Sequence, residues 1–283
     1  MAVLPIGLST GCFYELPIER VLADIAAAGF EELEISTAPT HFPYRDPLAV
    51  ERVRALLDDL GLRAVSMHAP YNRTIDITSP ERARRRHAVD ELVRGAEAAA
   101  RLGADLYVMH AGPEIERQHL LQDYVPRLRQ AIVSVDEIVA RCYELGLQPA
   151  LENMLPHLVL GGVRQLLRFL AEDRAGRVAV CLDTGHARLG GEIETAVGEL
   201  AAYMAVVHLH DNLGREDDHL PPGDGSIAWD HVVGQLLHFG FRGRWLLELT
   251  GRGVRDIPGT IAAAQRGREF LRSTAARVAP EDE

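Results

Sequence analysis

Lysine is absent from this sequence, and all 30 of its basic residues are arginine. Catalysis through a lysine Schiff base, lysine-driven β-elimination and phosphate binding by a P-loop lysine are therefore excluded as intrinsic activities. The 41 acidic residues outnumber the arginines and give a net charge of -11, which weighs against general affinity for nucleic acid. A local cluster of arginines would still be able to bind a phosphate group.

Long apolar runs and cysteines are also scarce. No stretch approaches the roughly 18 uninterrupted apolar residues of a membrane span, and the N-terminus lacks the basic start and cleavage site of a signal peptide. We therefore expect a cytoplasmic protein that does not enter a membrane. The three cysteines, Cys12, Cys142 and Cys181, lie in predicted core segments at no metal-ligand spacing. This predicts buried thiols and argues against a disulfide framework or a zinc ribbon.

The apolar residues form a repeated unit. A helical pattern that ends in glycine and leads at once into an apolar run occurs six times, with glycine at positions 29, 61, 103, 146, 176 and 240. Glycine there supplies the left-handed turn that ends a helix. With two further runs we expect eight strands, at residues 3–8, 32–36, 63–68, 105–110, 147–152, 178–183, 205–210 and 244–249. Helical patterns follow the strands, for example at 17–28, 47–60, 80–102 and 163–171.

Strict alternation of eight strands with eight helical segments predicts an α/β fold, the (β/α)8 TIM barrel. An open doubly wound sheet is the alternative, but it is expected to carry a G-x-G-x-x-G turn after a strand, and no strand here is followed by one. No linker or low-complexity segment interrupts the pattern. We therefore expect a single domain over residues 1–278, followed by a polar tail at 279–283.

Ionisable residues gather at the carboxyl ends of the expected strands. They are Glu34, His68, His110, Glu152, Asp183, His186, His208, His210, Asp211 and Glu248. Because these ends of a parallel barrel converge on one mouth, the carboxylates would repel one another unless cations lay between them. Mixed imidazole and carboxylate ligands suit zinc, manganese or iron better than magnesium or calcium. The pattern predicts a divalent-metal site.

Each of these residues also has a structural interpretation. A lone histidine at a strand end is more often a hydrogen-bonded structural residue than a ligand, and only the repetition favours metal. Glu152 and Glu248 could instead form buried ion pairs with arginine. For Glu34, a hydrogen-bond acceptor behind the site and a partner for a neighbouring arginine are equally expected. The remaining histidines are expected to be mostly solvated or to cap helices: His41, His87, His119, His157, His231 and His238.

Five ordered motifs carry a resemblance that spans nearly the whole chain. They are Leu-Glu-Asn at 151–153, Cys-Leu-Asp-Thr-Gly-His at 181–186, His-Leu-His-Asp-Asn at 208–212, Asp-Asp-His-Leu-Pro-Pro-Gly-Asp-Gly-Ser-Ile-Ala-Trp at 217–229 and Leu-Glu at 247–248. They resemble the xylose isomerase-like TIM barrel superfamily, which includes sugar phosphate isomerases and epimerases together with endonuclease IV-type enzymes. The motifs are far less specific for the reaction than for the superfamily.

The resemblance implies two sets of metal ligands. Resemblance to the sugar epimerases implies one metal on Glu152, Asp183, either His208 or His210, and Glu248, with the two glutamates as catalytic proton carriers. Resemblance to the endonuclease IV-type enzymes adds further ligands, for up to three metals: His68, His110 and Glu152 for the first; Glu152, Asp183, His208 and Glu248 for the second; His186, Asp217 and His219 for the third. We prefer His208 to His210 as the ligand, although both point to the same side of their strand.

Three functions are compatible with this site. We favour a divalent-metal-dependent isomerase or epimerase of a sugar, sugar phosphate or polyol, in which Glu152 and Glu248 transfer a proton through a metal-stabilised enediolate. The alternatives are a multinuclear zinc phosphodiesterase and a non-catalytic metal-binding barrel. The acidic charge, the lack of lysine and a loop at 69–80 with only Tyr71 for stacking on bases weigh against nucleic acid as the substrate.

Substrate contacts are expected around the mouth, from Glu34, Tyr71, His210, Asp211 and Arg215. Three arginines, Arg73, Arg188 and Arg215, follow strands at positions where a substrate phosphate or carboxylate could be bound, although solvated loop charge is the commoner role for any one of them. The arginine run at 82–86 is interpreted as an exposed helix face. Oligomeric state is left open, with a homo-oligomer as one outcome.

Overall fold

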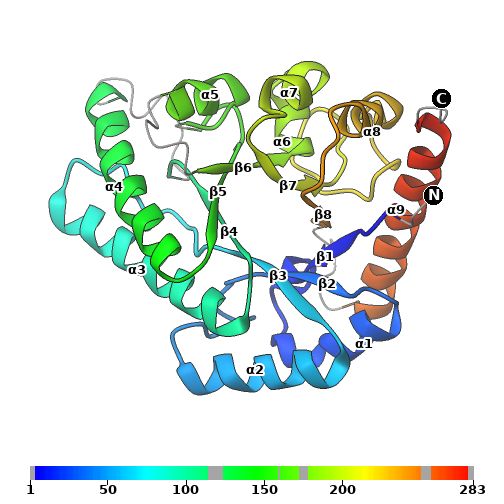
Figure 1. Ribbon diagram of the computed structural model, residues 1–283, viewed down its shortest axis with the longest axis horizontal. Helices are drawn as coiled ribbons and strands as arrows, with labels where there is room; N and C mark the ends of the chain where they lie inside the picture. Colours follow the sequence, from blue (N-terminus) through cyan, green and yellow to red (C-terminus); the bar gives the residue numbers. More distant parts are fainter. Residues whose placement is uncertain (1–3, 114–123, 159, 172–177, 250–255, 280–283) are drawn as a thin grey trace.

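The expected barrel is present in the computed structural model, which describes residues 4–113, 124–158, 160–171, 178–249 and 256–279. Eight parallel strands pair in chain order, and the last pairs with the first to close a single-domain barrel (Figure 1). The strands are β1 (Gly7–Ser9), β2 (Glu32–Ile35), β3 (Arg63–His68), β4 (Leu106–His110), β5 (Gln148–Glu152), β6 (Ala179–Asp183), β7 (Met204–Leu209) and β8 (Arg244–Leu247).

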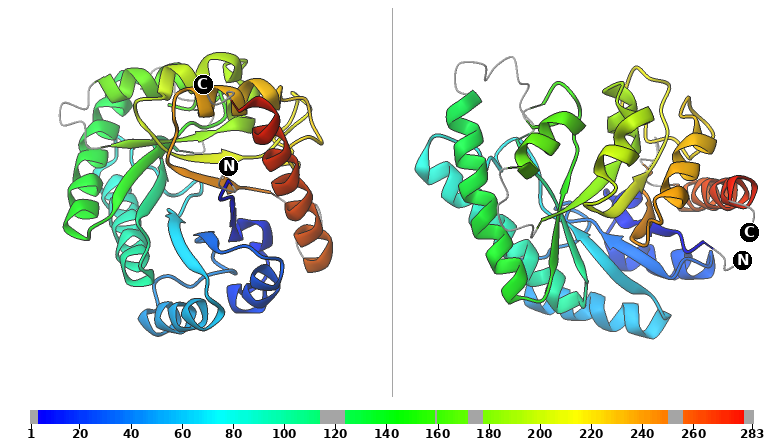
Figure 2. Two further views of the ribbon diagram at one scale, coloured as in Figure 1. Left: turned by 45° about the vertical axis from the view of Figure 1, so that its right-hand side comes forward. Right: turned by 45° about the horizontal axis from the view of Figure 1, so that its top comes forward.

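Helices surround the strands on the outside of the barrel (Figures 1 and 2). In the described residues these are α1 (Leu22–Ala27), α2 (Pro47–Leu60), α3 (Arg82–Leu102), α4 (Tyr124–Glu144), α5 (Val163–Ala171), α6 (Thr184–Leu189), α7 (Ile193–Leu200), α8 (Trp229–His238) and α9 (Ile257–Val278), with 3-10 turns η1 (Thr10–Phe13) and η2 (Ile18–Arg20). The expectation of one helix after each strand is wrong after β6, where α6 and α7 both occur. The boundary at 278 for the domain remains a prediction, and α9 ends at that residue.

Glycine ends the helices as the repeated pattern predicts. Five of the six expected positions, residues 29, 61, 103, 146 and 240, have positive φ angles between 66° and 81°. An L-residue with a side chain would be strained there. The sixth expected position, residue 176, lies outside the described residues.

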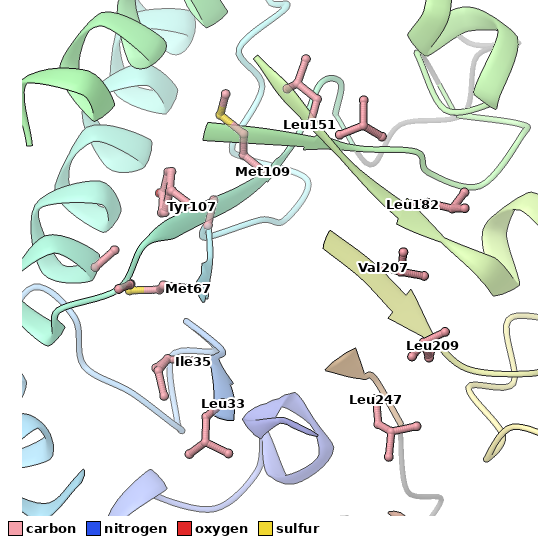
Figure 3. Packing of buried hydrophobic residues seen from close by; sticks show 14 of the residues in the cluster. Leu33, Ile35, Met67, Tyr107, Met109, Leu151, Leu182, Val207, Leu209 and Leu247 are labelled. Carbon is pink, nitrogen blue, oxygen red and sulfur yellow. The ribbon is translucent and has the colours of Figure 1, made fainter. Parts of the chain in front are cut away.

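Alternation along the strands sorts the core into two layers. Val206 on β7 faces the interior of the barrel, whereas Val207 and Leu209 belong to the layer between strands and helices. The same outer layer holds Tyr107, Met109, Leu151 and Leu182, which Figure 3 shows. Since side chains alternate with a period of two, the interior row of β7 continues from Val206 to His208. The apolar floor of the barrel therefore leads directly to the polar mouth.

Two further expectations concern the cysteines and the membrane. Cys12, Cys142 and Cys181 are all fully buried free thiols, as predicted. Among the described residues, no helix combines the length and the apolar character needed to cross a bilayer.

Candidate metal centre and active site

Three groups of candidate ligands meet at the mouth of the barrel. Within each group the ligand atoms lie within 4.8 Å of one another: His68, His110 and Glu152; Glu152, Asp183, His208 and Glu248; His186, Asp217 and His219. These are the three groups that the resemblance implies. The barrel thus brings together residues that are up to 180 positions apart in the chain.

Glu152 at the end of β5 lies at the centre of the site. It is 1% exposed, and its carboxylate lies 3.1 Å from Nε2 of His68 and 3.6 Å from Nδ1 of His208. His110 and His186 each have a ring nitrogen 3.7 Å from it. Among the described residues, the ion-pair partners of this carboxylate are therefore imidazoles. The alternative of a buried ion pair with arginine gains no support.

His208 and His210 have different partners at the mouth. Nδ1 of His208 lies 3.0 Å from Oε2 of Glu248, and neither atom makes a hydrogen bond. Nε2 of His210 instead donates to both carboxylate oxygens of Asp183, at 2.8 and 2.9 Å, and its ring stacks on His219. His210 is fully buried behind Asp183, which favours a role in orienting that carboxylate over the expected substrate contact. His210 also forms a candidate group with His219 and Glu248, so the choice of His208 as ligand stays a prediction.

Three of the histidines are oriented by backbone carbonyls. Nδ1 of His68 lies 2.9 Å from the carbonyl of Ala69, Nδ1 of His186 lies 2.9 Å from the carbonyl of Asn153, and His219 makes the same contact with Glu248. Donation from Nδ1 to these carbonyls leaves Nε2 directed at a carboxylate. This is the arrangement by which proteins commonly orient imidazole ligands.

Carboxylates at the mouth raise the pKa of three of the histidines. Burial by itself would lower the pKa of His68, but Glu152 raises it to about 9. Asp183 and Asp217 outweigh burial to raise the pKa of His186 to about 10, and Asp217 does the same for His219, to about 9. The carboxylates therefore hold extra protons on the imidazoles when no metal is bound.

Several buried atoms at the mouth also lack a hydrogen-bond partner. They are Nδ1 of His110, His208 and His210, Oδ1 of Asp217 and Oε2 of Glu248. Burial lowers the pKa of His110 to about 3, so its ring is neutral and keeps a lone pair for a ligand bond. Clustered imidazole and carboxylate donors and buried polar atoms without partners together fit divalent metal ions.

Glu34 supports the floor of the site from β2. Its carboxylate is fully buried and accepts hydrogen bonds from Ser66 Oγ at 2.9 Å and from Ser9 Oγ at 3.4 Å. Nε2 of His208 lies 3.2 Å from it, on the side of the ring opposite Glu248. Of its two interpretations, the acceptor behind the site fits this geometry and the arginine partner does not. The expected contact of Glu34 with substrate is not favoured, because the side chain lies beneath His208.

We expect Glu34→Gln to weaken metal binding by about 10-fold to 100-fold, because the neutral amide orients and polarises the His208 ring less well than a carboxylate. Competition with a chromophoric chelator measures the affinity directly. Glu31→Gln, on the exposed residue three positions earlier, is the matched control and should leave the affinity unchanged. Equal affinities for wild type and Glu34→Gln would remove this role.

Asp211 organises the loop that carries Asp217 and His219. Its fully buried carboxylate accepts the indole N–H of Trp229 at 2.7 Å and backbone N–H groups of Asn212, Gly223, Ser226 and Ile227. Both oxygens are therefore used by the loop. This favours a supporting role over the expected substrate contact.

Replacing this carboxylate by an amide should loosen the loop. Asp211→Asn would turn an amide NH2 toward N–H donors, and we expect it to lower the free energy of unfolding by about 2–3 kcal/mol. Urea denaturation measures the change. Asp224→Asn, at an exposed position of the same loop, should be close to wild type. A fully stable Asp211→Asn protein would show that the network contributes little.

The other expected contacts have mixed outcomes. The Tyr71 ring lies 4.9 Å from the rings of both His68 and His110, so it is at the mouth as expected. Arg215 is exposed and lines neither of the cavities described below, because its loop turns it toward solvent. His41 is fully buried, with Nδ1 2.6 Å from the carbonyl of Leu16, so the expectation of a solvated or capping residue is wrong. His119 lies outside the described residues.

Two cavities meet at the candidate ligands. The smaller has a volume of about 270 Å³ and is lined by His68, Tyr71, Arg73, His110, Glu152, Met154, Leu155, Leu158, His186, Asp217, His219 and Glu248. The larger, of about 620 Å³, shares His68, Tyr71, His219 and Glu248 with it and extends over the loops after β1 and β2. The walls that these two loops contribute are not predicted from sequence. The Phe-Pro-Tyr run at 42–44 was the available signal, because aromatic residues in a polar loop are unusual.

Comparison with known proteins identifies the family. A family model described as "Xylose isomerase-like TIM barrel" matches residues 22–274. The chain belongs to this family. Its relatives include a probable endonuclease 4 of Acholeplasma laidlawii, which is 26% identical over 220 residues, 70% of this chain and 71% of that protein.

Solved structures with the xylose isomerase-like fold cover almost the whole barrel. A D-tagatose 3-epimerase-like protein is 26% identical and covers 95% of this chain and 99% of its own, with a TM-score of 0.79. The IolI protein, solved with a bound zinc atom, is 16% identical and covers 96% and 99%, with a TM-score of 0.82. This barrel therefore has a sugar isomerase and epimerase fold, with endonuclease 4-like homologues.

Proposed function

We propose that this xylose isomerase-like barrel is a divalent-metal-dependent isomerase or epimerase of a sugar or related polyol. The observation that carries the proposal is that Glu152 and Glu248 line one cavity of about 270 Å³, with His208 between their carboxylates. Two carboxylates at one small cavity suit proton transfer to and from a carbon atom. Glu152, Asp183, His208 and Glu248 would hold the metal, which would polarise a substrate carbonyl when bound.

Glu248 is the better placed of the two proton carriers. Its side chain is 18% exposed and reaches both cavities, whereas that of Glu152 is 2% exposed and enclosed by histidines. Burial would raise the pKa of Glu248, but the charge of His208 outweighs burial and keeps the pKa below its usual range. Glu248 is therefore ionised at neutral pH and able to accept a proton.

The proposed reaction removes one proton from a carbon atom of the substrate and returns one. Glu248 takes the proton from the carbon next to the substrate carbonyl, and the electron pair of the broken C–H bond moves toward the carbonyl oxygen. Glu152 takes a proton from the protonated His68, whose Nε2 lies 3.1 Å from its carboxylate, and passes it to carbon; exchange with solvent then restores His68 and removes the proton held by Glu248. Delivery to the opposite face of the same carbon gives epimerisation. Delivery to the former carbonyl carbon, with transfer of the neighbouring hydroxyl proton to the former carbonyl oxygen, gives aldose-ketose isomerisation. The imidazoles around Glu152 also hold its carboxylate in place.

One observation favours a second candidate function, a multinuclear zinc phosphodiesterase. The outer groups, with His68 and His110 on one side and His186, Asp217 and His219 on the other, extend the ligand set beyond the four residues that a single metal needs. In that case Glu152 would belong to two of the ligand groups and would not be free to carry a proton.

Solvent exchange distinguishes the two chemistries. Protein loaded with zinc or manganese is incubated in deuterium oxide with a panel of ketoses, and separately with a duplex that contains an abasic site. We expect deuterium to enter the carbon next to the carbonyl and the duplex to remain intact. Cleavage of the duplex without exchange into any sugar would overturn the proposal in favour of the phosphodiesterase.

A further inference from the structure

The loop after β3, residues 69–81, contributes to the boundary between the two cavities. Four residues line both cavities: His68, Tyr71, His219 and Glu248. Of these four, Tyr71 is the one that is not a candidate metal ligand. Bound metal would therefore help to fix the other three, whereas the place of Tyr71 depends on what holds its loop.

Tyr71 is joined to a buried segment by a tight turn. The side chain itself is 50% exposed, so its own packing fixes it only in part. Directly after it, Oδ1 of Asn72 accepts the backbone N–H of Thr74 at 2.7 Å and that of Ile75 at 3.2 Å. The chain then enters residues 76–79, all of which are buried. Whatever holds this segment also holds Tyr71.

A buried ion pair links the segment to α4. Arg127 of α4 is 8% exposed, and its Nη1 donates to Oδ2 of the fully buried Asp76 at 2.9 Å and to Oγ1 of Thr78 at 3.0 Å. Oδ1 of Asp76 accepts the backbone N–H of Thr78 at 3.0 Å and its hydroxyl at 2.6 Å. Ser134, also on α4, donates to the carbonyl of Ile77 at 2.8 Å. The helix thus holds this part of the loop at successive residues.

This pair is better suited to positioning than to stabilising. Apolar residues of similar volume often stabilise a protein as well as a buried ion pair does, because two charges must be taken out of water. Nε of Arg127 is buried without a hydrogen-bond partner, which adds to the cost. What apolar residues would not supply is a directed link between α4 and the loop. Neither Asp76 nor Arg127 lines either cavity, so any effect on the substrate has to pass through the loop.

We propose that Arg127 and Asp76 are positioning residues that hold Tyr71 at the boundary of the smaller cavity and thereby limit the length of ketose that the site accepts. This inference rests on the proposed function. A short ketose fits within the smaller cavity and does not reach the boundary. A longer chain has to pass Tyr71 to extend into the larger cavity, and a loosened loop would let it pass.

The double variant Asp76→Asn/Arg127→Met tests the inference without leaving an unpaired charge in the interior. Solvent deuterium exchange gives kcat/KM for erythrulose, a four-carbon ketose, and for sedoheptulose, a seven-carbon ketose. We expect the ratio of sedoheptulose to erythrulose to rise by about tenfold, roughly the smallest discrimination that one methylene group gives in a pocket. Loss of folded protein would lower both values equally and leave the ratio unchanged. An unchanged ratio would overturn the inference.

Thr78→Val is the milder variant, because it removes one hydroxyl from the same network and no charge. It should raise the ratio in the same direction by a smaller factor, and it decides the question if the double variant does not fold. A wild-type ratio in well-folded Thr78→Val would then count against the inference.

Further substitutions show whether the effect passes through Tyr71. Tyr71→Ala should raise the ratio by itself, and adding Asp76→Asn/Arg127→Met to it should change the ratio no further. Arg141→Met is the matched control, since Arg141 also lies on α4 but pairs at the surface with Glu97 and Glu144. It should keep the wild-type ratio. Independent, additive effects of Tyr71→Ala and the double variant would show that the pair acts elsewhere.

Amide hydrogen exchange separates failure of the inference from failure of the proposed function. The backbone N–H groups of Thr78 and Ser79 both donate to Asp76. We expect the amides of residues 74–79 to exchange faster in Asp76→Asn/Arg127→Met and as in wild type in Arg141→Met. If no ketose takes up deuterium but this pattern is seen, the proposed function fails and the positioning of the loop stands. If ketoses react but these amides exchange as in wild type in the double variant, the inference alone is overturned.

Discussion

Glu248→Gln is expected to reduce solvent deuterium exchange into the substrate by about 10²-fold to 10⁴-fold, the usual contribution of a positioned acid or base. The amide matches the carboxylate in size but cannot accept the proton from carbon. Glu248 is also the proton carrier with access to both cavities, whereas Glu152 is enclosed by imidazoles. Initial rates of exchange, followed by NMR or mass spectrometry, measure the effect.

Metal content has to be measured alongside, because Glu248 is also a candidate ligand. If Glu248→Gln retains its metal and loses exchange, the loss belongs to proton transfer. Glu199→Gln, on an exposed position of α7, changes the same functional group far from the mouth and should behave as wild type. A Glu248→Gln protein with normal exchange would end the assignment of this residue as a proton carrier.

The fold could be predicted because its two periodicities are strong. The run at 63–68 is followed by the long helix α3 and the run that ends in Glu152 by the short amphipathic helix α5, and β3 has the expected bounds. The first strand was expected at 3–8 but covers only Gly7–Ser9. Its pairing with β8 involves only Gly7 and Leu8, so the apolar character of the preceding residues does not decide the strand. Apolar runs predict which residues are buried more reliably than they predict which residues pair with a neighbouring strand.

Residues at strand ends gather at the mouth as expected, and so do Asp217 and His219 from the loop after β7, but two other residues of that loop do not make the contacts expected of them. Glu152, Asp183 and His208 lie at the ends of interior rows, where the barrel itself fixes their direction. The direction of Asp211 and Arg215 depends on the loop that follows β7. That loop folds around the Asp211 carboxylate and leaves Arg215 in solvent, an outcome set by hydrogen bonds between residues up to 18 positions apart.

The walls of the larger cavity show the same limit. Phe42 and Leu249 belong to segments after β2 and β8 that are far apart in sequence. Neither helical nor strand periodicity links them. Only the closed barrel, which places β8 next to β1 and β1 next to β2, brings the two segments to one cavity.

Metal binding is expected to release protons and to weaken as the pH falls. In the metal-free protein the pKa of His208, the imidazole of the proposed ligand set, lies well above its usual range, so His208 must lose a proton before it binds the metal. The pKa of His68 is about 9, that of His186 about 10 and that of His219 about 9, and the positive charge of the metal should drive protons off these neighbouring imidazoles as well. For each proton released, the apparent affinity should fall about tenfold per unit of pH between 8 and 6. Calorimetry in buffers of different ionisation enthalpy counts the protons, and elemental analysis counts the metals.

The same shifts predict how stability depends on pH. Because these pKa values lie above the ordinary 6.5, their contribution to the metal-free fold is complete below about pH 6.5 and is lost as the pH rises through 9 to 10. The Tm of the metal-free protein should therefore decline over this range, and bound metal should reduce the decline by taking over the positive charge.

On metal binding, His186→Gln should release about one proton fewer than wild type, whereas His87→Gln, on an exposed position of α3, should release as many as wild type. About one metal per chain with exchange supports the isomerase or epimerase. About three metals with cleavage of an abasic duplex would replace it with the phosphodiesterase, and failure to bind any divalent metal would contradict both.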